Sequence, residues 1–150
     1  MRYLEDYEPG EIMRFGSYEV RREEMLEFAG KYDPQDFHLD DAAAARSAVF
    51  KRMSASGWHT ASMMMAMQVA TFGPGEPPFV AALGVDQLRW HEPVYAGDVL
   101  DCERRVLDAR PSGSRPGMGV LRMHTTVRNQ NGEPVMTMIS AVLVKRRPTD

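Results

Sequence analysis

The hydrophobic pattern of the first 50 residues changes twice. Residues 11–20 alternate imperfectly between apolar and polar side chains, which predicts a strand. Between residues 21 and 32 the apolar side chains recur every three or four positions, as they do on a helix with one buried face. Residues 41–50 are rich in alanine and begin with an aspartate, which favours a second, short helix. The first third of the chain therefore predicts a strand and two helices, with residues 33–40 between the helices.

The most apolar segment, residues 58–72, has hydrophobic side chains on nearly every side. Four of them are methionines, at positions 63, 64, 65 and 67, and methionine commonly fills irregular space in a protein core. A helix without a polar face must be surrounded by protein, so we expect a buried helix that begins near Ser56 and Gly57. The segment is shorter than the roughly 20 residues of a membrane span, and it contains His59 and Gln68. The Gly- and Pro-rich residues 73–78 should end this helix.

The second half of the chain has the pattern of strands. Strands are predicted at residues 79–91, 99–107, 120–129 and 135–144. A turn at residues 93–97, a connection at residues 109–117 and a two-residue hairpin at Asn131-Gly132 should join them, and residues 145–150 should form a solvated tail. The order of elements predicts an α+β fold, in which an antiparallel sheet wraps around the central buried helix. Because such a sheet leaves exposed edges, we expect a homodimer or a dimer-based higher oligomer.

Composition and charge narrow the classes of function. The formal net charge of −3 and the pI near 5.8 give no general electrostatic footprint for nucleic acid. The single cysteine, Cys102, excludes an intramolecular disulfide and a multi-cysteine zinc site, and it suits a reducing cytoplasm. The first residues have neither the basic region nor the apolar region of a signal peptide. We therefore expect a cytoplasmic protein with no membrane or nucleic-acid partner.

Residues 33–40 have the composition of an active site. They place three carboxylates and one imidazole within eight residues, and Pro34 biases Asp33 away from helical geometry. The preceding helix should therefore end near Tyr32 and leave Asp33 and His38 on an irregular segment, where functional residues are common. Farther along, the backbone N–H of Gly57 lies in the first turn of the buried helix, where it has no partner within the helix and can serve as an oxyanion donor.

Other interpretations of these residues remain open. Asp33 before a proline is a common turn residue, and Gly57 can simply permit close packing. Carboxylates and imidazole also suit hard metal ions, here Asp36, His38, Asp40 and Asp41, although we expect Asp40 to cap the next helix and Asp36 to face solvent. We expect His59 to be an interior histidine whose hydrogen bonds are satisfied. The strand arginines should mostly form a solvated face, and they are Arg89, Arg104, Arg105, Arg122 and Arg128.

The same residues resemble the MaoC-like, or (R)-specific enoyl-CoA hydratase, branch of the hot-dog fold. The resemblance rests on residues 28–29, 33–40 and 56–61, and it extends to residues 88–90, 93–94 and 97–98. The family signature has an aspartate five residues before a histidine, and later a glycine that opens the central helix. Asp33, His38 and Gly57 match these positions. Gln35, Asp36 and Ser56 stand where the family often has asparagine, proline and histidine.

The resemblance implies one hot-dog domain over residues 1–150 that acts on an acyl thioester of coenzyme A or an acyl carrier protein. Water would be added across the 2,3-bond or removed from it, without a metal or redox cofactor, close to a subunit interface. Asp33 and His38 would activate the water, and Gly57 would stabilise the enolate oxygen. We expect substrate contacts from Gln35, Phe37, Ser56 and Trp58. A thioesterase and a non-catalytic acyl-thioester binding subunit are the alternatives, because a fold does not determine chemistry.

Overall fold

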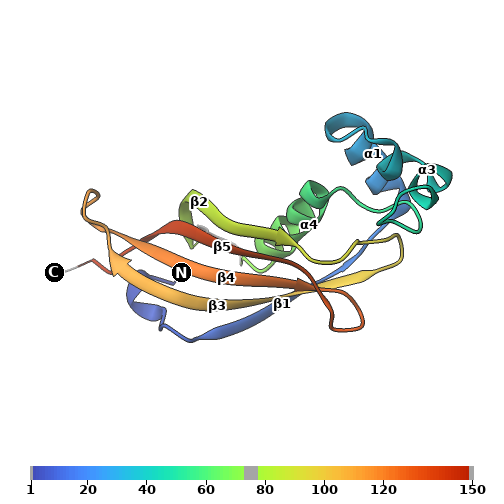
Figure 1. Ribbon diagram of the computed structural model, residues 1–150. Coiled ribbons are helices and arrows are strands. Elements are labelled where there is room, and N and C mark those ends of the chain that lie inside the picture. The colour runs from blue at the N-terminus through green and yellow to red at the C-terminus, as the bar shows by residue number, and fades with distance from the viewer. Residues whose placement is uncertain (1, 73–77, 149–150) are drawn as a thin grey trace.

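The computed structural model describes residues 2–72 and 78–148, and a five-stranded antiparallel sheet forms its framework. The strands are β1 (Ile12–Glu19), β2 (Phe79–Trp90), β3 (Val99–Pro111), β4 (Met118–Arg128) and β5 (Pro134–Lys145). Their order across the sheet is β1-β3-β4-β5-β2, which leaves β1 and β2 at the edges. Figure 1 shows that the strands are long and curved. The predicted α+β fold with an antiparallel sheet is confirmed.

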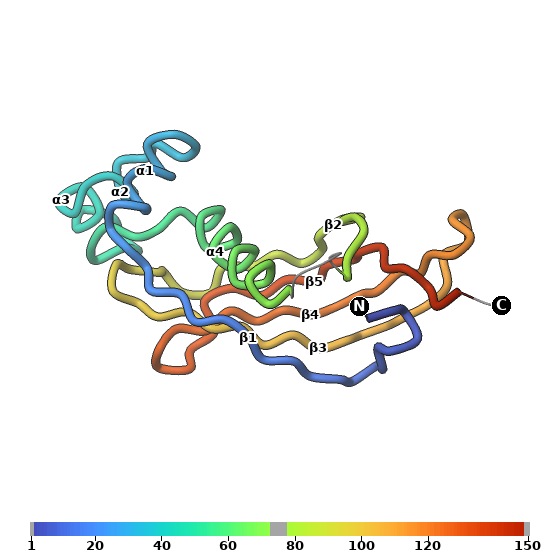
Figure 2. The backbone as a smooth tube through the Cα atoms, turned by 180° about the vertical axis from the view of Figure 1, so that it is seen from behind, coloured from blue at the N-terminus to red at the C-terminus, as the bar shows by residue number. Residues whose placement is uncertain are grey.

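The helices lie in two places relative to the sheet. Helix α4 (Gly57–Ala70) lies along one face of the sheet, whereas α1 (Arg22–Tyr32), α2 (Asp36–Leu39) and α3 (Asp41–Ala45) lie beyond one end of it. Figure 2 shows the same separation from behind, with both termini at the opposite end of the sheet. A short 3-10 helix, η1 (Leu4–Asp6), precedes β1. The segment between α1 and α4 is therefore placed at the N-terminal end of α4.

The sheet bends around α4 at a bulge in β1. The pairing of β1 with β3 shifts between Phe15 and Tyr18, and Gly16 in this bulge has a φ of +82°, a conformation that favours glycine. A Cβ atom on Gly16 would lie 2.4 Å from the sulfur of Met67. Glycine is thus required twice, for the bend and for the close approach of α4.

Helix α4 is covered on only one side, which contradicts the prediction of a helix surrounded by protein. Its buried residues are His59, Thr60, Met63, Met64, Met67 and Gln68. Trp58, Met65 and Val69 are instead exposed by 59, 46 and 53%. The prediction was wrong for the single chain because the sheet covers one face of the helix, and no described segment of the chain covers the apolar opposite face.

The segment between α1 and α4 differs from the prediction at both ends. Its start, which was expected to be irregular, contains a helical turn, and its end is less helical than expected. Residues 36–39 form the single turn of α2, and α3 ends at Ala45 instead of continuing to residue 50. The hydroxyl of Ser47 accepts hydrogen bonds from the N–H groups of Val49 and Phe50, which competes with helical hydrogen bonding. As expected, Asp36 is exposed and Asp40 caps α3 by accepting a hydrogen bond from Ala43.

Two of the predicted connections and the predicted C-terminal tail differ in the structure. Strand β3 continues to Pro111 because it stays paired with β4, so the connection shortens to residues 112–117. The N–H of Gly132 bonds to the carbonyl of Asn129, and the N–H of Asn129 bonds to the carbonyl of Glu133, so the hairpin loop has three residues instead of two. Residues 145–147 are not a free tail, because β5 includes Lys145 and the next two residues form ion pairs with Glu5 and Asp6.

The strand arginines were expected to be mostly solvated, but Arg104 is buried. Its side chain is buried on β3, with the guanidinium 4.6 Å from the centre of the Phe15 ring and hydrogen-bonded to Gln68. Its Nε atom has no partner among the described residues. Burial lowers the pKa of Arg104 to about 10, since no described carboxylate lies close enough to offset the lost hydration. Helix α4 ends at Ala70, before the Gly- and Pro-rich residues 73–78 that were predicted to end it, and residues 73–77 lie outside the described residues.

Candidate active site

Asp33 lies where α1 ends and Pro34 prevents the helix from continuing. One carboxylate oxygen accepts a hydrogen bond of 2.6 Å from the Gln35 amide, and the other accepts one of 2.7 Å from the Ser56 hydroxyl. Partial burial alone would raise the pKa of Asp33, but these two hydrogen bonds, and the positive charge of the His38 ring when it is protonated, lower it. Asp33 is therefore held ionised in a fixed orientation at the N-terminal end of α4.

The His38 ring is buried and faces Asp33. Its Nδ1 atom is 2.7 Å from the backbone carbonyl of Ser54, which can only accept a hydrogen bond, so the proton is assigned to Nδ1. Its Nε2 atom is then the ring nitrogen that lies 3.4 Å from the Asp33 carboxylate. In the neutral ring this nitrogen is an acceptor, and two adjacent acceptors can bind the two protons of one water molecule.

Gly57 is the first residue of α4, and its N–H has no acceptor among the described residues. A Cβ atom at this position would lie 2.5 Å from the Trp90 ring, whose Nε1 donates a 2.8 Å hydrogen bond to the Gly57 carbonyl. The glycine therefore allows β2 to pack against the start of α4. The same residue leaves a backbone N–H free at the positive end of the helix dipole.

A cavity of about 330 Å³ brings Asp33, His38 and Gly57 together. Trp58, predicted to contact substrate, also lines it and makes an edge contact with Trp90 at 5.1 Å between ring centres. Further walls come from Phe50, Thr60 and the segment at residues 90–94. The cavity combines aromatic and aliphatic walls with a few polar groups, as binding sites for small molecules commonly do.

The other predicted substrate contacts lie behind this cavity. Gln35 and Ser56 do not line it and are bonded to Asp33 instead. Phe37 supports His38 by an edge contact at 4.6 Å between ring centres and stacks on Phe50. In this structure these three side chains orient the residues that face the cavity.

Residues 90–94 line the cavity but were not predicted to belong to the site. They reach it because the N–H of Ala55 donates to the carbonyl of Val94, and Ser54 pairs with Tyr95 in an isolated β-bridge. Trp90 and Pro93 belong to the family pattern found in the sequence, but the pattern alone does not indicate that this segment crosses the start of α4. Such a contact between distant segments has no local sequence signal.

Neither a metal site nor a membrane helix is found in residues 2–72 and 78–148. No group of three or more His, Cys, Asp or Glu side chains there could hold a metal ion, and Asp40 and Asp41 have other partners. No helix in these ranges is long and apolar enough to cross a membrane.

The chain is similar to several proteins of solved structure. A MaoC-like dehydratase from Rhodospirillum rubrum has a solved structure that matches with a TM-score of 0.89 and 37% identity, covering 99% of this chain and all of the other. The R-hydratase PhaJ1 from Pseudomonas aeruginosa matches with a TM-score of 0.74 and 29% identity, covering 97% of this chain and 86% of the other. The (R)-hydratase from A. caviae gives a TM-score of 0.70 and 27% identity, over 95% of this chain and 98% of the other.

Two curated sequences are also similar. The uncharacterised protein YdeM of Bacillus subtilis is 27% identical over 95% of this chain and 99% of its own length. A mesaconyl-CoA hydratase from Cereibacter sphaeroides is 37% identical over 47% of this chain, which is 20% of that enzyme. The family model described as the MaoC like domain matches residues 6–127. The chain therefore belongs to the MaoC-like family of hydratases and dehydratases and has its hot-dog fold.

Proposed function

We propose that this protein is an acyl-thioester hydro-lyase that hydrates a 2-enoyl-CoA to a 3-hydroxyacyl-CoA or catalyses the reverse dehydration. One observation carries the proposal: the Asp33 carboxylate, the His38 ring and the free N–H of Gly57 border the same cavity. Hydration needs a base for water, a proton donor for C2 and a group that stabilises the enolate oxygen. The three residues offer these functions within one site.

Asp33 and His38 bind and activate the water. With a proton on Nδ1, the Nε2 atom of His38 accepts one water proton while Asp33 accepts the other, since these atoms are only 3.4 Å apart. As the water oxygen bonds to C3, one proton moves to the pair and the C2–C3 double bond becomes an enolate. The pair then delivers that proton to C2, which completes the addition of one water molecule. Because the two groups are coupled, we assign the transferred proton to the pair.

Gly57 stabilises the charge that develops on the thioester oxygen. Its N–H lies at the start of the 14-residue helix α4, where the helix dipole favours negative charge. Loss of a comparable oxyanion donor costs roughly 3 kcal/mol of barrier stabilisation. The absence of a Cβ also lets the carbonyl approach the backbone.

The names of related proteins support this class of reaction. The A. caviae and Pseudomonas aeruginosa relatives are (R)-hydratases, and the Cereibacter sphaeroides relative is a hydratase of a coenzyme A thioester. We therefore favour coenzyme A over an acyl carrier protein as the carrier of the acyl group. The single cysteine is consistent with action in the cytoplasm.

The proposed working form is a homodimer. Strand β2 is an exposed sheet edge that carries Val80, Leu83 and Val85, and the neighbouring α4 exposes Met65 and Val69. Exposed apolar edges favour pairing with another chain, and a second copy would cover both surfaces. Light scattering should give a dimer for the wild type, and Val85→Asp should give a monomer. A monomeric wild-type protein would contradict this part of the proposal.

Incubation with crotonyl-CoA tests the reaction. Hydration removes the enoyl-thioester absorbance without releasing a free thiol. Asp33→Asn and His38→Ala should each lower turnover by about 10²- to 10⁴-fold while substrate binding persists. Asp36→Asn is the matched control, because that carboxylate lies in the same segment but is exposed and does not line the cavity.

Two results would count against a hydro-lyase. Release of thiol without loss of the double bond would indicate a thioesterase. Binding of acyl-CoA compounds without turnover, across a panel of enoyl chain lengths, would indicate a binding subunit.

A further inference from the structure

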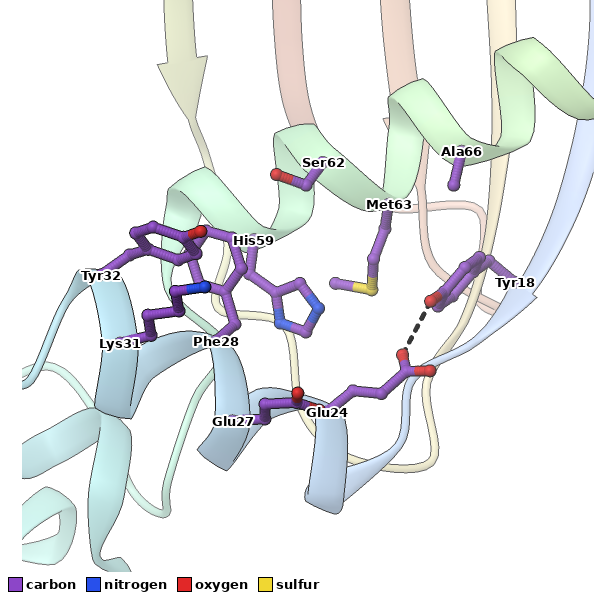
Figure 3. A pocket seen from close by; sticks show the side chains of 10 residues that line it. All are labelled: Tyr18, Glu24, Glu27, Phe28, Lys31, Tyr32, His59, Ser62, Met63 and Ala66. Carbon is purple, nitrogen blue, oxygen red and sulfur yellow. Dashed lines mark hydrogen bonds between the residues drawn. The ribbon is translucent and has the colours of Figure 1, made fainter.

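A second cavity, of about 380 Å³, lies between α1 and α4 on the side of β1. It shares no lining residue with the cavity of Asp33 and His38. Figure 3 shows its walls: aromatic rings from Tyr18, Phe28 and Tyr32, and the side chains of His59 and Met63 from α4. Its volume is within the range of sites that bind small molecules.

His59 gives this cavity an unsatisfied polar group. The residue is 94% buried, since only 6% of its surface is exposed, and its ring points into the space between the two helices in Figure 3. The ring stacks on Phe28 with 4.8 Å between ring centres, and its Nδ1 atom has no hydrogen-bond partner among the described residues. The expectation of a satisfied interior histidine was therefore wrong. Burial lowers the pKa of His59 and so favours the neutral ring, whose Nδ1 atom is an acceptor in the tautomer that carries the proton on Nε2.

The hydroxyl groups at the cavity also present acceptors. Tyr18 donates its proton to Glu24 over 2.7 Å, and Ser62 donates its proton to the Trp58 carbonyl over 2.8 Å. Each hydroxyl oxygen keeps lone pairs that can accept from a ligand. A ligand for this cavity therefore needs to be a hydrogen-bond donor.

The charged side chains that line the cavity also favour a ligand that donates hydrogen bonds. Glu24 and Glu27 are carboxylates, and Lys31 is the cation in the lining. Glu24 is paired with Arg21, which does not line the cavity, whereas Glu27 has no ion pair among the described residues. The Lys31 ammonium already lies 5.2 Å from the centre of the Tyr32 ring, a contact that aromatic rings make with cations. An unpaired carboxylate and aromatic faces thus border the same space.

We propose that the cavity between α1 and α4 is a binding site for a small organic ammonium ion that carries a flat apolar group. The ammonium donates to Glu27 and to the free nitrogen of His59, and the apolar group lies against Phe28 and Met63. A metal ion fits less well, because no group of three or more suitable ligands occurs in the described part of the chain. The site is independent of the proposed hydration reaction.

Three probes of similar size test the proposal by titration calorimetry with the full-length protein. Benzylamine is cationic at neutral pH, benzyl alcohol is neutral and benzoate is anionic. Benzylamine should bind at least about fivefold more tightly than the other two, as expected for one favourable ionic contact. The imidazole NMR signals of His59 should shift during the titration. Absence of binding, or equal binding of all three probes, would overturn the proposal.

Variants of three carboxylates test whether benzylamine binds in this cavity. Glu27→Gln should weaken benzylamine binding about fivefold. Glu23→Gln, which removes the same charge from an exposed position of α1 that does not line the cavity, should leave it unchanged. Asp33→Asn should also bind benzylamine normally. Equal losses in the Glu27 and Glu23 variants, or loss of binding in the Asp33 variant, would refute a specific site between the helices.

Discussion

Replacing Ser56 with alanine should change the pH dependence of turnover more clearly than it changes the fold. The Ser56 hydroxyl is buried and donates a 2.7 Å hydrogen bond to the Asp33 carboxylate oxygen that also faces His38. This bond lowers the pKa of Asp33 in the native protein. Its removal leaves the Gln35 amide, and the His38 ring when it is protonated, as the groups that favour the ionised carboxylate. Asp33 should therefore become easier to protonate.

The size of the effect follows from the strength of the lost bond. A hydrogen bond to a charged group contributes about 1.5–3 kcal/mol, and about 1.4 kcal/mol corresponds to one pH unit. Asp33 is partly accessible to water, which can replace some of the lost interaction, so the lower end of the range applies. The acid limb of kcat/KM should move upward by about one pH unit.

The assay is the hydration of crotonyl-CoA, followed by the loss of enoyl absorbance between about pH 2.5 and 8. The range extends below the ordinary aspartate pKa because the pKa of Asp33 is lowered in the native protein. Ser112→Ala is a suitable control, because that hydroxyl accepts a hydrogen bond from Arg115 in the connection between β3 and β4, away from the site. The control should keep the wild-type pH profile. An unchanged acid limb in Ser56→Ala, with the fold intact, would show that Asp33 does not control that limb.

Three other variants test the packing and the charge arrangement. Gly57→Ala places a methyl group 2.5 Å from the Trp90 ring, so urea denaturation should show a loss of about 1–3 kcal/mol, and adding Trp90→Ala should remove most of the penalty caused by the methyl group. The double variant Arg104→Met/Gln68→Met should be as stable as the wild type or more stable, because it replaces a buried cation without a described carboxylate partner by apolar groups; a large loss of stability would refute this reasoning. The hydrogen bond from Arg2 lowers the pKa of Glu11, so its stabilising contribution is complete above the ordinary glutamate pKa and disappears as the pH falls. Glu11→Gln should accordingly show a shallower loss of thermal stability on acidification.

Local sequence patterns predicted most of the elements correctly. The alternation in β4 places Leu121, Met123 and Val127 on the buried face, as the structure shows. Pro34 ends α1 at Tyr32, and the aspartate at position 40 caps α3. Each of these features depends on residues that are close together in the sequence.

The early end of α3 and the three-residue hairpin loop are local errors, whereas the other errors concern contacts between distant segments. The extension of β3 to Pro111 depends on pairing with β4, and the burial of Arg104 depends on the positions of Gln68 and Phe15. The open side of α4 was missed because the composition of a helix does not reveal how much of it a sheet can cover. At the candidate site, the matched spacing predicted Asp33, His38 and Gly57, which line one cavity, but the contribution of residues 90–94 required the tertiary structure.

The β-bridge between Ser54 and Tyr95 has a consequence for the kinetics of folding. It attaches the segment before α4 to the segment after β2, and β2 takes its place in the sheet only by pairing with β5, about 50 residues farther along the chain. Pairing over such a separation is slow compared with helix formation, because a long loop must close first. During refolding, helical circular dichroism should therefore recover before catalytic activity. An intermediate with formed helices would still lack one wall of the cavity.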